Sequence, residues 1–286
     1  MSEDYDTMMN VLIPTDFSEN SHNAIKYAQA YFSDLAVNFY VLHVSHQNSY
    51  PKEEEQGSFT DFESEMQTIQ STSVLLREEI KTCQLRSKNQ AHKFFPLHEN
   101  MNLVEAIRKQ VAEKEINYIL MGTKGTSKTN RSELGSNTCD VITKVKCPIL
   151  VIPEYARFNG IKNIAFLTDY NCIYRNKVIS SLSETLDLHQ SPLRVLHIKA
   201  QNNDLTASQT DNKGFLHYFF KEKKHSFHFV ENKDLETGIQ DFVETWEISL
   251  VSIVAKNLNL IQRLLLRPTV KSVSYTADVP FLVLHE

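Results

Sequence analysis

The stretch that decides the fold reads Ile116-Asn117-Tyr118-Ile119-Leu120-Met121-Gly122-Thr123-Lys124-Gly125, and Gly135-Ser136 follow after nine further residues. Its first six residues have the apolar character of a buried strand. Only 7 of the 286 residues are glycine, and three of them fall in this window. Glycine lets the backbone approach an anion closely, and a helix start offers unpaired N–H donors. The pattern therefore indicates a nucleotide site.

The spacing differs from the two best-known phosphate loops. A Walker loop requires Gly-x4-Gly-Lys-Ser/Thr, and a dinucleotide-binding fold requires Gly-x-Gly-x-x-Gly after its first strand. The sequence contains neither pattern. The first expected strand, residues 9–14, runs instead into Thr15-Asp16-Phe17-Ser18.

The spacing Gly-x2-Gly-x9-Gly-Ser resembles that of the ATP-binding branch of the universal stress protein family. Other motifs carry the same resemblance over residues 8–153. The first strand and turn, the end of the second strand and the last strand of that family are similar to Asn10-Val11-Leu12-Ile13-Pro14-Thr15-Asp16-Phe17-Ser18, Val41-Leu42-His43-Val44 and Cys147-Pro148-Ile149-Leu150-Val151-Ile152. The resemblance implies an adenine nucleotide α-hydrolase-like sheet with strand order 3-2-1-4-5.

Composition excludes several classes of protein. Hydrophobic residues make up 41% and charged residues 23%, which suits packed cores rather than disorder. A formal charge of −5 argues against a nucleic-acid partner. No apolar run approaches the roughly 18 residues of a membrane span, and the acidic first residues are not a secretory signal. We expect a cytoplasmic protein whose scattered cysteines fill small core spaces, namely Cys83, Cys139, Cys147 and Cys172.

An internal repeat divides the chain into two similar halves. Residues 10–17 align with 163–170, and residues 41–44 align with 195–198. Near the ends, residues 147–151 align with 279–283, so the second half has lost about 22 residues from its middle. We predict two domains of the same family, residues 1–154 with the intact nucleotide motif and residues 161–286 without it.

Strand and helix patterns alternate within the first half. Strand-like runs are expected at residues 9–14, 37–44, 92–97, 116–121 and 148–153, with helical apolar stripes between them. This order predicts an α/β protein of two tandem doubly wound parallel-sheet domains, the second shortened, with helices on both faces of each sheet. Two polar segments, residues 46–57 and 201–213, are expected to be mobile connections.

In a doubly wound sheet, ligands bind at the carboxyl ends of the strands where the strand order reverses. With the order 3-2-1-4-5, that position lies between the first and fourth strands. Thr15 and Asp16 follow the first of these strands, and the Gly122 loop follows the fourth. We therefore expect the two motifs to face one another.

The resemblance assigns a role to each matching position. Asp16 would accept a hydrogen bond from adenine or ribose, and Pro14 and Thr15 would line the base pocket. The ribose and phosphates would lie along Met121, Gly122, Thr123, Lys124 and Gly125. The phosphate tail would be held by Gly135, Ser136, Asn137 and Thr138. The expected cofactor is ATP, with Mg²⁺ bridging its phosphates, although no carboxylate cage predicts a dedicated metal site.

Each assignment has a plainer alternative. Asp16, Ser18 or Ser136 could simply cap the helix that it precedes. His43 and His197 occupy matched positions in the two halves, and a satisfied core or edge histidine is the expected role for both.

The second half departs from the motif. Thr168 and Asp169 are retained. The positions of Gly122, Gly125, Gly135 and Ser136 become Val254, Asn257, Arg267 and Pro268. A proline there removes a backbone donor, so we expect this half to have lost nucleotide binding.

The leading hypothesis is a regulatory, stress-response protein that binds one ATP per chain and is sensed by an unknown protein partner. The apolar last strands of the two halves would pair edge to edge in an internal pseudo-dimer, on which a homo-oligomer could be built. One alternative is a slow ATPase or self-phosphorylating enzyme, but the motif places no general base, so no catalytic residue is named. Another is an interaction scaffold that binds no nucleotide.

Overall fold

A computed structural model describes residues 8–45, 59–123, 135–171, 174, 176–198, 204–230, 235–257 and 278–285. The chain divides into two compact units, Met1–Met121 and Gly122–Glu286. No described helix is both long enough and apolar enough to cross a bilayer.

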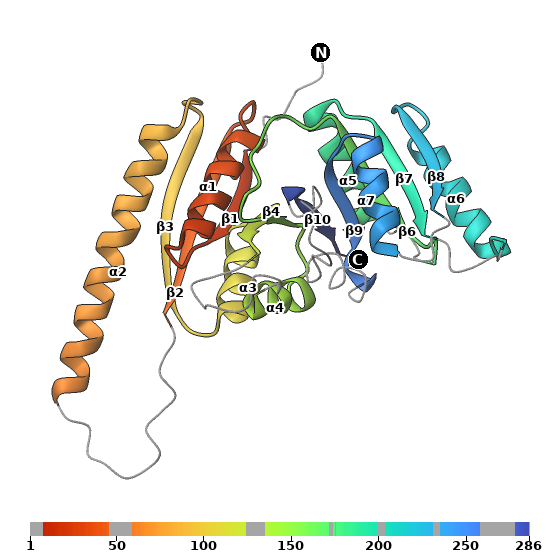
Figure 1. Ribbon diagram of the computed structural model, residues 1–286. Helices are drawn as coiled ribbons and strands as arrows, with labels where there is room; N and C mark the ends of the chain where they lie inside the picture. Colours follow the sequence, from red (N-terminus) through yellow and green to blue (C-terminus); the bar gives the residue numbers. More distant parts are fainter. Residues whose placement is uncertain are drawn as a thin grey trace, which may run out of the picture. The chain divides into compact units, whose positions relative to one another are not determined.

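The first unit alternates strands and helices along a parallel sheet. Its strands lie in the order β3-β2-β1-β4. The central strand β1 is covered on both faces, and Val11, Leu12 and Ile13 are each 0% exposed. Helix α2 runs along the edge strand β3 (Figure 1). The elements are β1 (Met9–Pro14), α1 (Glu19–Tyr31), β2 (Val37–Ser45), α2 (Phe59–Arg86), β3 (His92–Asn100), α3 (Leu103–Glu113) and β4 (Tyr118–Gly122).

The second unit contains a sheet in the order β5-β10-β9-β6-β7-β8. All neighbours are parallel except β5 and β10, which pair antiparallel. The elements are α4 (Ser136–Lys144), β5 (Ile149–Ile152), β6 (Asn163–Thr168), α5 (Asn176–His189), β7 (Leu193–Ile198), α6 (Ala207–Phe219), β8 (His225–Val230), α7 (Leu235–Thr245), β9 (Ile248–Val254), the short helix η1 (Ala255–Asn257) and β10 (Phe281–Leu284).

The strand order confirms the predicted fold class. The first unit has the order third, second, first, fourth, and Thr123, directly after β4, donates its N–H to the carbonyl of Ile152 in β5 (3.1 Å). The strands β8-β7-β6-β9-β10 repeat the same order in the second half of the chain. The expected pairing of the two apolar last strands is confirmed as well, with Leu282 opposite Leu150.

Several element bounds differ from expectation, most of them by one or two residues. Strand β3 continues to Asn100 because its polar end still pairs in register with β2. Strand β4 begins only at Tyr118, since the N–H of Ile116 bonds back to Val111 and closes α3. The prediction of a connection over residues 201–213 is wrong for residues 207–213, which belong to α6. Thr206 and Gln209 form a capping box that starts this helix.

The division into compact units does not follow the repeat. Helix α4 and strand β5 fall in the second unit, where β5 pairs with β10. The predicted domains, residues 1–154 and 161–286, were derived from the internal repeat in the sequence. These domain bounds stay a prediction.

His285 ties the end of β10 to α4. Its ring is 8% exposed, and its Nε2–H donates to the carbonyl oxygen of Ile142 (2.7 Å). Burial lowers the pKa of His285 below its ordinary value, and the charges of Lys146 and Lys177 act in the same direction. The folded protein therefore holds His285 in its neutral form.

We predict that His285→Gln makes unfolding less sensitive to acid. The pKa of His285 is lower in the folded than in the unfolded chain. Its contribution to the free energy of unfolding is therefore fully present above about pH 6.5 and is lost as the pH falls. A difference of one bound proton can change the free energy of unfolding by at most about 1.4 kcal/mol per pH unit. Urea unfolding between about pH 7.5 and 5.5, followed by the single tryptophan, Trp246, measures the slope. The lowered pKa values of His92, His98 and His228 leave a residual slope in the variant. An unchanged slope would contradict the prediction.

Two of the three described cysteines have the expected role as core residues, whereas Cys139 is partly exposed. Cys83 is 0% exposed and Cys147 is 1% exposed. Burial raises the pKa of each of these two thiols to about 12, and the Glu79 carboxylate adds to the effect at Cys83. Neither thiol is therefore ionised near neutral pH.

We expect a thiol reagent at about pH 8 to spare Cys83 and Cys147 in the folded protein, because thiolates are the reactive species. Cys139 is partly exposed and should react first of the three. Peptide mass mapping after short labelling would measure this order, with urea-unfolded protein as the control. Equal labelling of Cys83 and Cys139 in the folded state would refute it.

Candidate functional site

The turn after β1 is held by its own side chains. The hydroxyl of Thr15 accepts the N–H of Phe17 (3.1 Å) and donates to Ser21 Oγ (3.1 Å). Asp16 Oδ1 accepts both the N–H (3.1 Å) and the hydroxyl (2.6 Å) of Ser18. Ser18 itself caps α1, since its side chain accepts the N–H of Ser21. The helix cap is thus Ser18, and Asp16 holds that cap in place.

His43 supports this turn from β2. Its Nδ1–H donates to the carbonyl of Thr15 (2.9 Å), because a carbonyl can only accept. Its ring stacks on Phe17 at 4.6 Å between centroids. Phe17 has a φ of +61°, a conformation that costs energy for a bulky residue and needs such support. The expected role of His43 as a satisfied strand histidine is confirmed, and its ring also supports the turn that carries the predicted site residues.

The strand ends of β1 and β4 lie side by side in the first unit. Leu12 pairs with Ile119, so this register places Pro14, the last residue of β1, opposite Met121, one residue before the end of β4. Met121 is 6% exposed and Thr15 is also 6% exposed. The first unit thus brings Pro14, Thr15, Asp16 and Met121 to one edge of its sheet.

The second unit contains the residues on either side of the glycine loop. The N–H of Gly135 donates to the carbonyl of Thr123 (2.8 Å), so the two ends of the loop meet. Thr138 Oγ1 donates to the carbonyl of Gly122 (3.0 Å), which fixes the first turn of α4 to the end of β4. Thr138 is consequently 3% exposed and points its hydroxyl into the protein.

Helix α4 starts without a side-chain cap. Gly135 occupies the N-cap position and has no side chain that could accept the first N–H groups. Ser136 and Asn137 are exposed at this start. No side chain of the described residues caps the first N–H groups, and the helix dipole favours an anion at this end. An N-cap role for Ser136 is excluded, because Ser136 is the first helical residue.

The predicted loop residues Lys124 and Gly125 lie outside the described residues, as do Arg267 and Pro268 of the second half. That the β1 turn and the glycine loop face one another stays a prediction. No cluster of three or more metal-ligating side chains exists among the residues that the structure describes.

The second half repeats this turn with the same kind of contacts, but its aromatic residue, Tyr170, is buried where Phe17 is partly exposed. His197 Nδ1–H donates to the Thr168 carbonyl (3.1 Å), and its ring stacks on Tyr170, whose φ is +57°. The hydroxyl of Thr168 also bonds the hydroxyl of Tyr174. His197 is 4% exposed and Tyr170 is 0% exposed, so the stacked rings of this turn are buried while Asp169 is partly exposed.

Helix α6 lies against the same turn. Gln209 Nε2 donates to the Asp169 carbonyl (2.9 Å), and Asn212 Nδ2 donates to the Tyr170 carbonyl (2.7 Å). Val254, which takes the position of Gly122, is 3% exposed at the end of β9 and pairs with Leu284. The carboxyl edge of this half is therefore filled where the first half has glycine.

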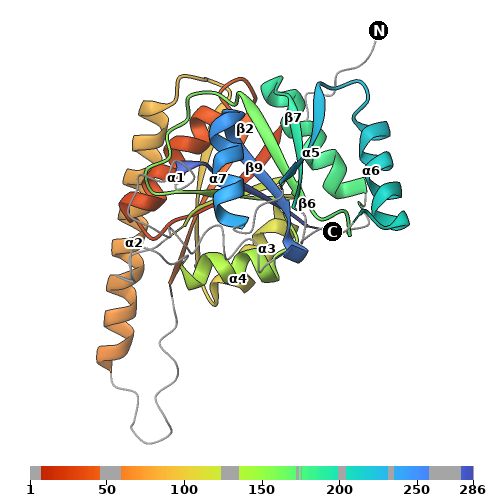
Figure 2. The same cartoon turned by 45° about the vertical axis from the view of Figure 1, so that its right-hand side comes forward.

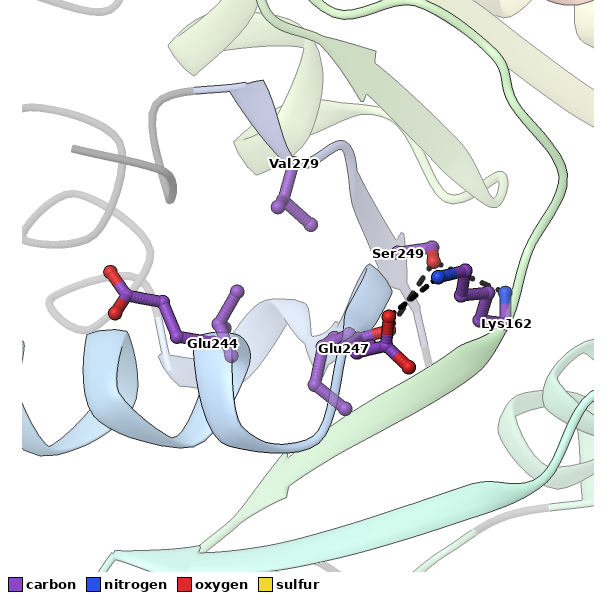
Figure 3. Close-up of a pocket in the computed structure, with 7 residues that line it drawn as sticks. Lys162, Glu244, Glu247, Ser249 and Val279 are labelled. Atoms are coloured by element: carbon purple, nitrogen blue, oxygen red, sulfur yellow. Dashed lines mark hydrogen bonds and ion pairs between the residues drawn. The ribbon is translucent and has the colours of Figure 1, made fainter. Parts of the chain in front are cut away.

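A pocket of about 430 Å³ opens at the other end of the second unit (Figure 3). It lies at the amino ends of β6 and β9, where sheets of this class do not bind their ligands. Lys162 Nζ contacts Glu247 Oε1 (2.5 Å), and the Lys162 N–H donates to Ser249 Oγ (3.1 Å). Glu244 extends away from this pair. Among the described lining residues, Lys162 is the basic one, and it is already paired with Glu247.

Comparison with known proteins identifies the family. Residues 8–153, about half of the chain, match the universal stress protein family. The chain therefore belongs to the universal stress protein family. No curated protein matches the chain.

Solved structures share the fold over both halves. A universal stress protein from Archaeoglobus fulgidus DSM 4304 is 16% identical and superposes with a TM-score of 0.68, covering 96% of this chain and 98% of that one. A functionally unknown protein from Pseudomonas aeruginosa PAO1 is 12% identical with a TM-score of 0.55, covering 98% of this chain and 93% of that one. At these identities the likeness establishes the fold alone.

We predict that His43→Phe destabilises the first unit by about 1 kcal/mol, because stacking on Phe17 is kept while the Thr15 carbonyl loses its donor. The matched variant His197→Phe should cost more, since His197 is 4% exposed and its partner carbonyl is left without water. Urea unfolding of both variants measures the difference. Equal losses, or none, would count against a positioning role for these histidines.

Proposed function

We propose that this universal stress protein binds ATP at the carboxyl ends of β1 and β4, one nucleotide per chain, in its N-terminal half. The observation that carries the proposal is the start of α4 beside the end of β4. Gly135 leaves the first N–H groups of α4 without a side-chain cap, and Ser136 and Asn137 are exposed beside them. These donors suit the oxygens of a polyphosphate.

The β1 turn supplies the groups that suit a nucleoside. Asp16 is an acceptor for ribose hydroxyls or the adenine amino group, and its carboxylate is oriented by Ser18. Pro14 and Thr15 would line the base, while Met121 and Gly122 would lie along the ribose. Lys124 would contribute charge to the phosphates. We propose Mg²⁺ as a bridge between phosphates rather than as an ion held by a protein cage.

The second half lacks the features that support binding in the first. Tyr170 is buried in its turn whereas the matching Phe17 is partly exposed, and Gln209 and Asn212 of α6 already donate to the carbonyls of this turn. Val254 puts a packed side chain at the position of Gly122. A second nucleotide would have to displace these contacts, which supports a stoichiometry of one.

We infer that ATP acts as a regulatory ligand in the cytoplasm. Occupancy of the loop would favour one arrangement of the residues between β4 and α4, and a partner protein would bind that arrangement preferentially. The slow ATPase and the nucleotide-independent scaffold are the alternatives that the experiment must separate.

Calorimetric titration of nucleotide-stripped protein with Mg-ATP should give one site per chain. Asp16→Ala should weaken binding about 10- to 100-fold, the cost of losing one hydrogen bond to a charged group. Asp169→Ala changes the matched position in the second half and should leave the affinity unchanged. Circular dichroism confirms that each variant is folded.

Two sites per chain would overturn the interpretation of the second half. A folded protein that binds no ATP would reject the proposal and favour the scaffold. Release of phosphate on incubation, lost in Asp16→Ala but kept in Asp169→Ala, would favour the enzyme.

A further inference from the structure

Helix α6 and the edge strand β8 bring two histidine rings into direct contact. The helix lies next to this strand in both views (Figures 1 and 2). His217 comes from the last turn of α6, and His225 is the first residue of β8. His217 Nδ1 lies 2.9 Å from His225 Nε2, and the ring centroids are 5.0 Å apart. Two imidazole nitrogens therefore meet where the helix contacts the strand.

The packing of α6 holds His217 at this position. Lys213, one helical turn earlier, places its Nζ over the rings of Phe227 (4.8 Å for Phe229 and 5.4 Å for Phe227 to the centroids). The His217 ring itself lies 6.1 Å from the Phe227 ring. Residues four apart share one flank of a helix, so this flank of α6 is turned towards β8. The approach of His217 to His225 follows from that orientation.

The backbone determines which nitrogen of His225 carries the proton. His225 Nδ1 lies 2.9 Å from the carbonyl oxygen of Lys223. Because a carbonyl can only accept, Nδ1 is the donor, and in the neutral ring Nε2 keeps its lone pair. That lone pair faces His217. Histidines that bind metals commonly donate their other ring N–H to a backbone carbonyl in this way.

The distance between the two nitrogens suits a metal ion. Bonds from a metal to imidazole nitrogen are about 2.0–2.1 Å long. Two such bonds at a right angle put the nitrogens about 2.9 Å apart, and a tetrahedral angle puts them about 3.3 Å apart. The ion would lie beside the line that joins the nitrogens, so both rings must turn towards it. His217 is exposed and His225 is partly exposed, so this rotation disturbs no buried core.

We propose that His217 Nδ1 and His225 Nε2 together bind one divalent transition-metal ion. Imidazole suits copper, nickel and zinc, and right-angled ligands suit the tetragonal geometry of Cu²⁺ or Ni²⁺. His217 would bind as the tautomer that carries its proton on Nε2, and His225 would keep its proton on Nδ1. No proton is lost from either ring, and water completes the coordination.

The site should be of moderate affinity. It supplies two protein ligands, and the nearby charge of Lys213 opposes a cation. The other stacked histidine pair is arranged differently. His43 Nδ1 bonds the Thr15 carbonyl and His98 Nε2 bonds Ser45 Oγ (2.8 Å), so each ring has a separate partner. We therefore expect the ion at α6 and β8.

Calorimetric titration of the tag-free, EDTA-treated full chain with NiCl₂, without nucleotide, tests the proposal. The wild type should bind one Ni²⁺ per chain with a Kd of about 1–100 µM, weaker than a site with four protein ligands. His217→Gln keeps an N–H donor for His225 but removes one metal ligand. This variant and His225→Gln should each weaken binding at least about 10-fold.

The matched control is His228→Gln in the same strand. His228 Nε2 bonds Ser226 Oγ (2.7 Å), and its ring packs on Trp246 at 4.4 Å between centroids. Its replacement should leave the Kd for Ni²⁺ within about 2-fold of the wild type. Long-range ¹H–¹⁵N spectra with Zn²⁺ give a second readout. The resonances of His217 Nδ1 and His225 Nε2 should move, while those of the His228 ring should stay.

Four results would overturn the proposal. A folded wild type that binds no Ni²⁺ below about 1 mM would leave the contact as a hydrogen bond between two imidazoles. Binding that survives both His217→Gln and His225→Gln would place the ion elsewhere. An equal loss in His228→Gln would trace the effect to the fold rather than to the pair. Zn²⁺ that moves only one of the two rings would exclude a shared ion.

Discussion

The antiparallel pairing of β5 with β10 is the interaction on which the second unit depends. Both strands are entirely apolar, and an apolar edge left open would pair with another chain. Leu150 and Leu282 face one another across the pairing, and each is 0% exposed. Strand β10 also pairs in parallel with β9, so this one short strand joins β5 to the strands of the second half. His285 adds a side-chain bond from the end of β10 to α4.

Because β5 pairs with β10, the compact units of this chain do not coincide with its sequence repeats. Sequence repetition groups α4 and β5 with the first half, whereas their contacts group them with the second. The helix proposed to bind phosphate is therefore held in place by the C-terminal strand. A loss of stability in the C-terminal half should therefore also loosen α4, the helix proposed to bind phosphate.

Much of the fold could be predicted because buried parallel strands have a strong apolar signal. Strand β1 was predicted with its observed bounds, and the strand order followed from the family resemblance. Helix α6 was missed because its exposed surface is polar at the start and aromatic at the end, which gives no amphipathic stripe. The Thr206 and Gln209 capping box was the readable signal.

The candidate site was only partly predictable for a different reason. The spacing of glycines identifies a loop. The contacts that hold a turn are single hydrogen bonds from side chains, and these produce no repeating pattern in the sequence. The His43 ring on Phe17 is one such contact, and the Tyr174 hydroxyl on Thr168 is another. A matched histidine in both halves hinted at the first of these contacts, whereas nothing in the spacing indicated the second.

The position of β10 also matters for how the chain is made. Strand β5 is complete at Ile152, but the strand that covers its edge begins at Phe281. At about 5–20 residues per second, a ribosome needs roughly 6 to 26 s to reach it. During that interval the nascent first half presents an open apolar edge, which is the state most exposed to chaperones and to mispairing between neighbouring chains on a polysome.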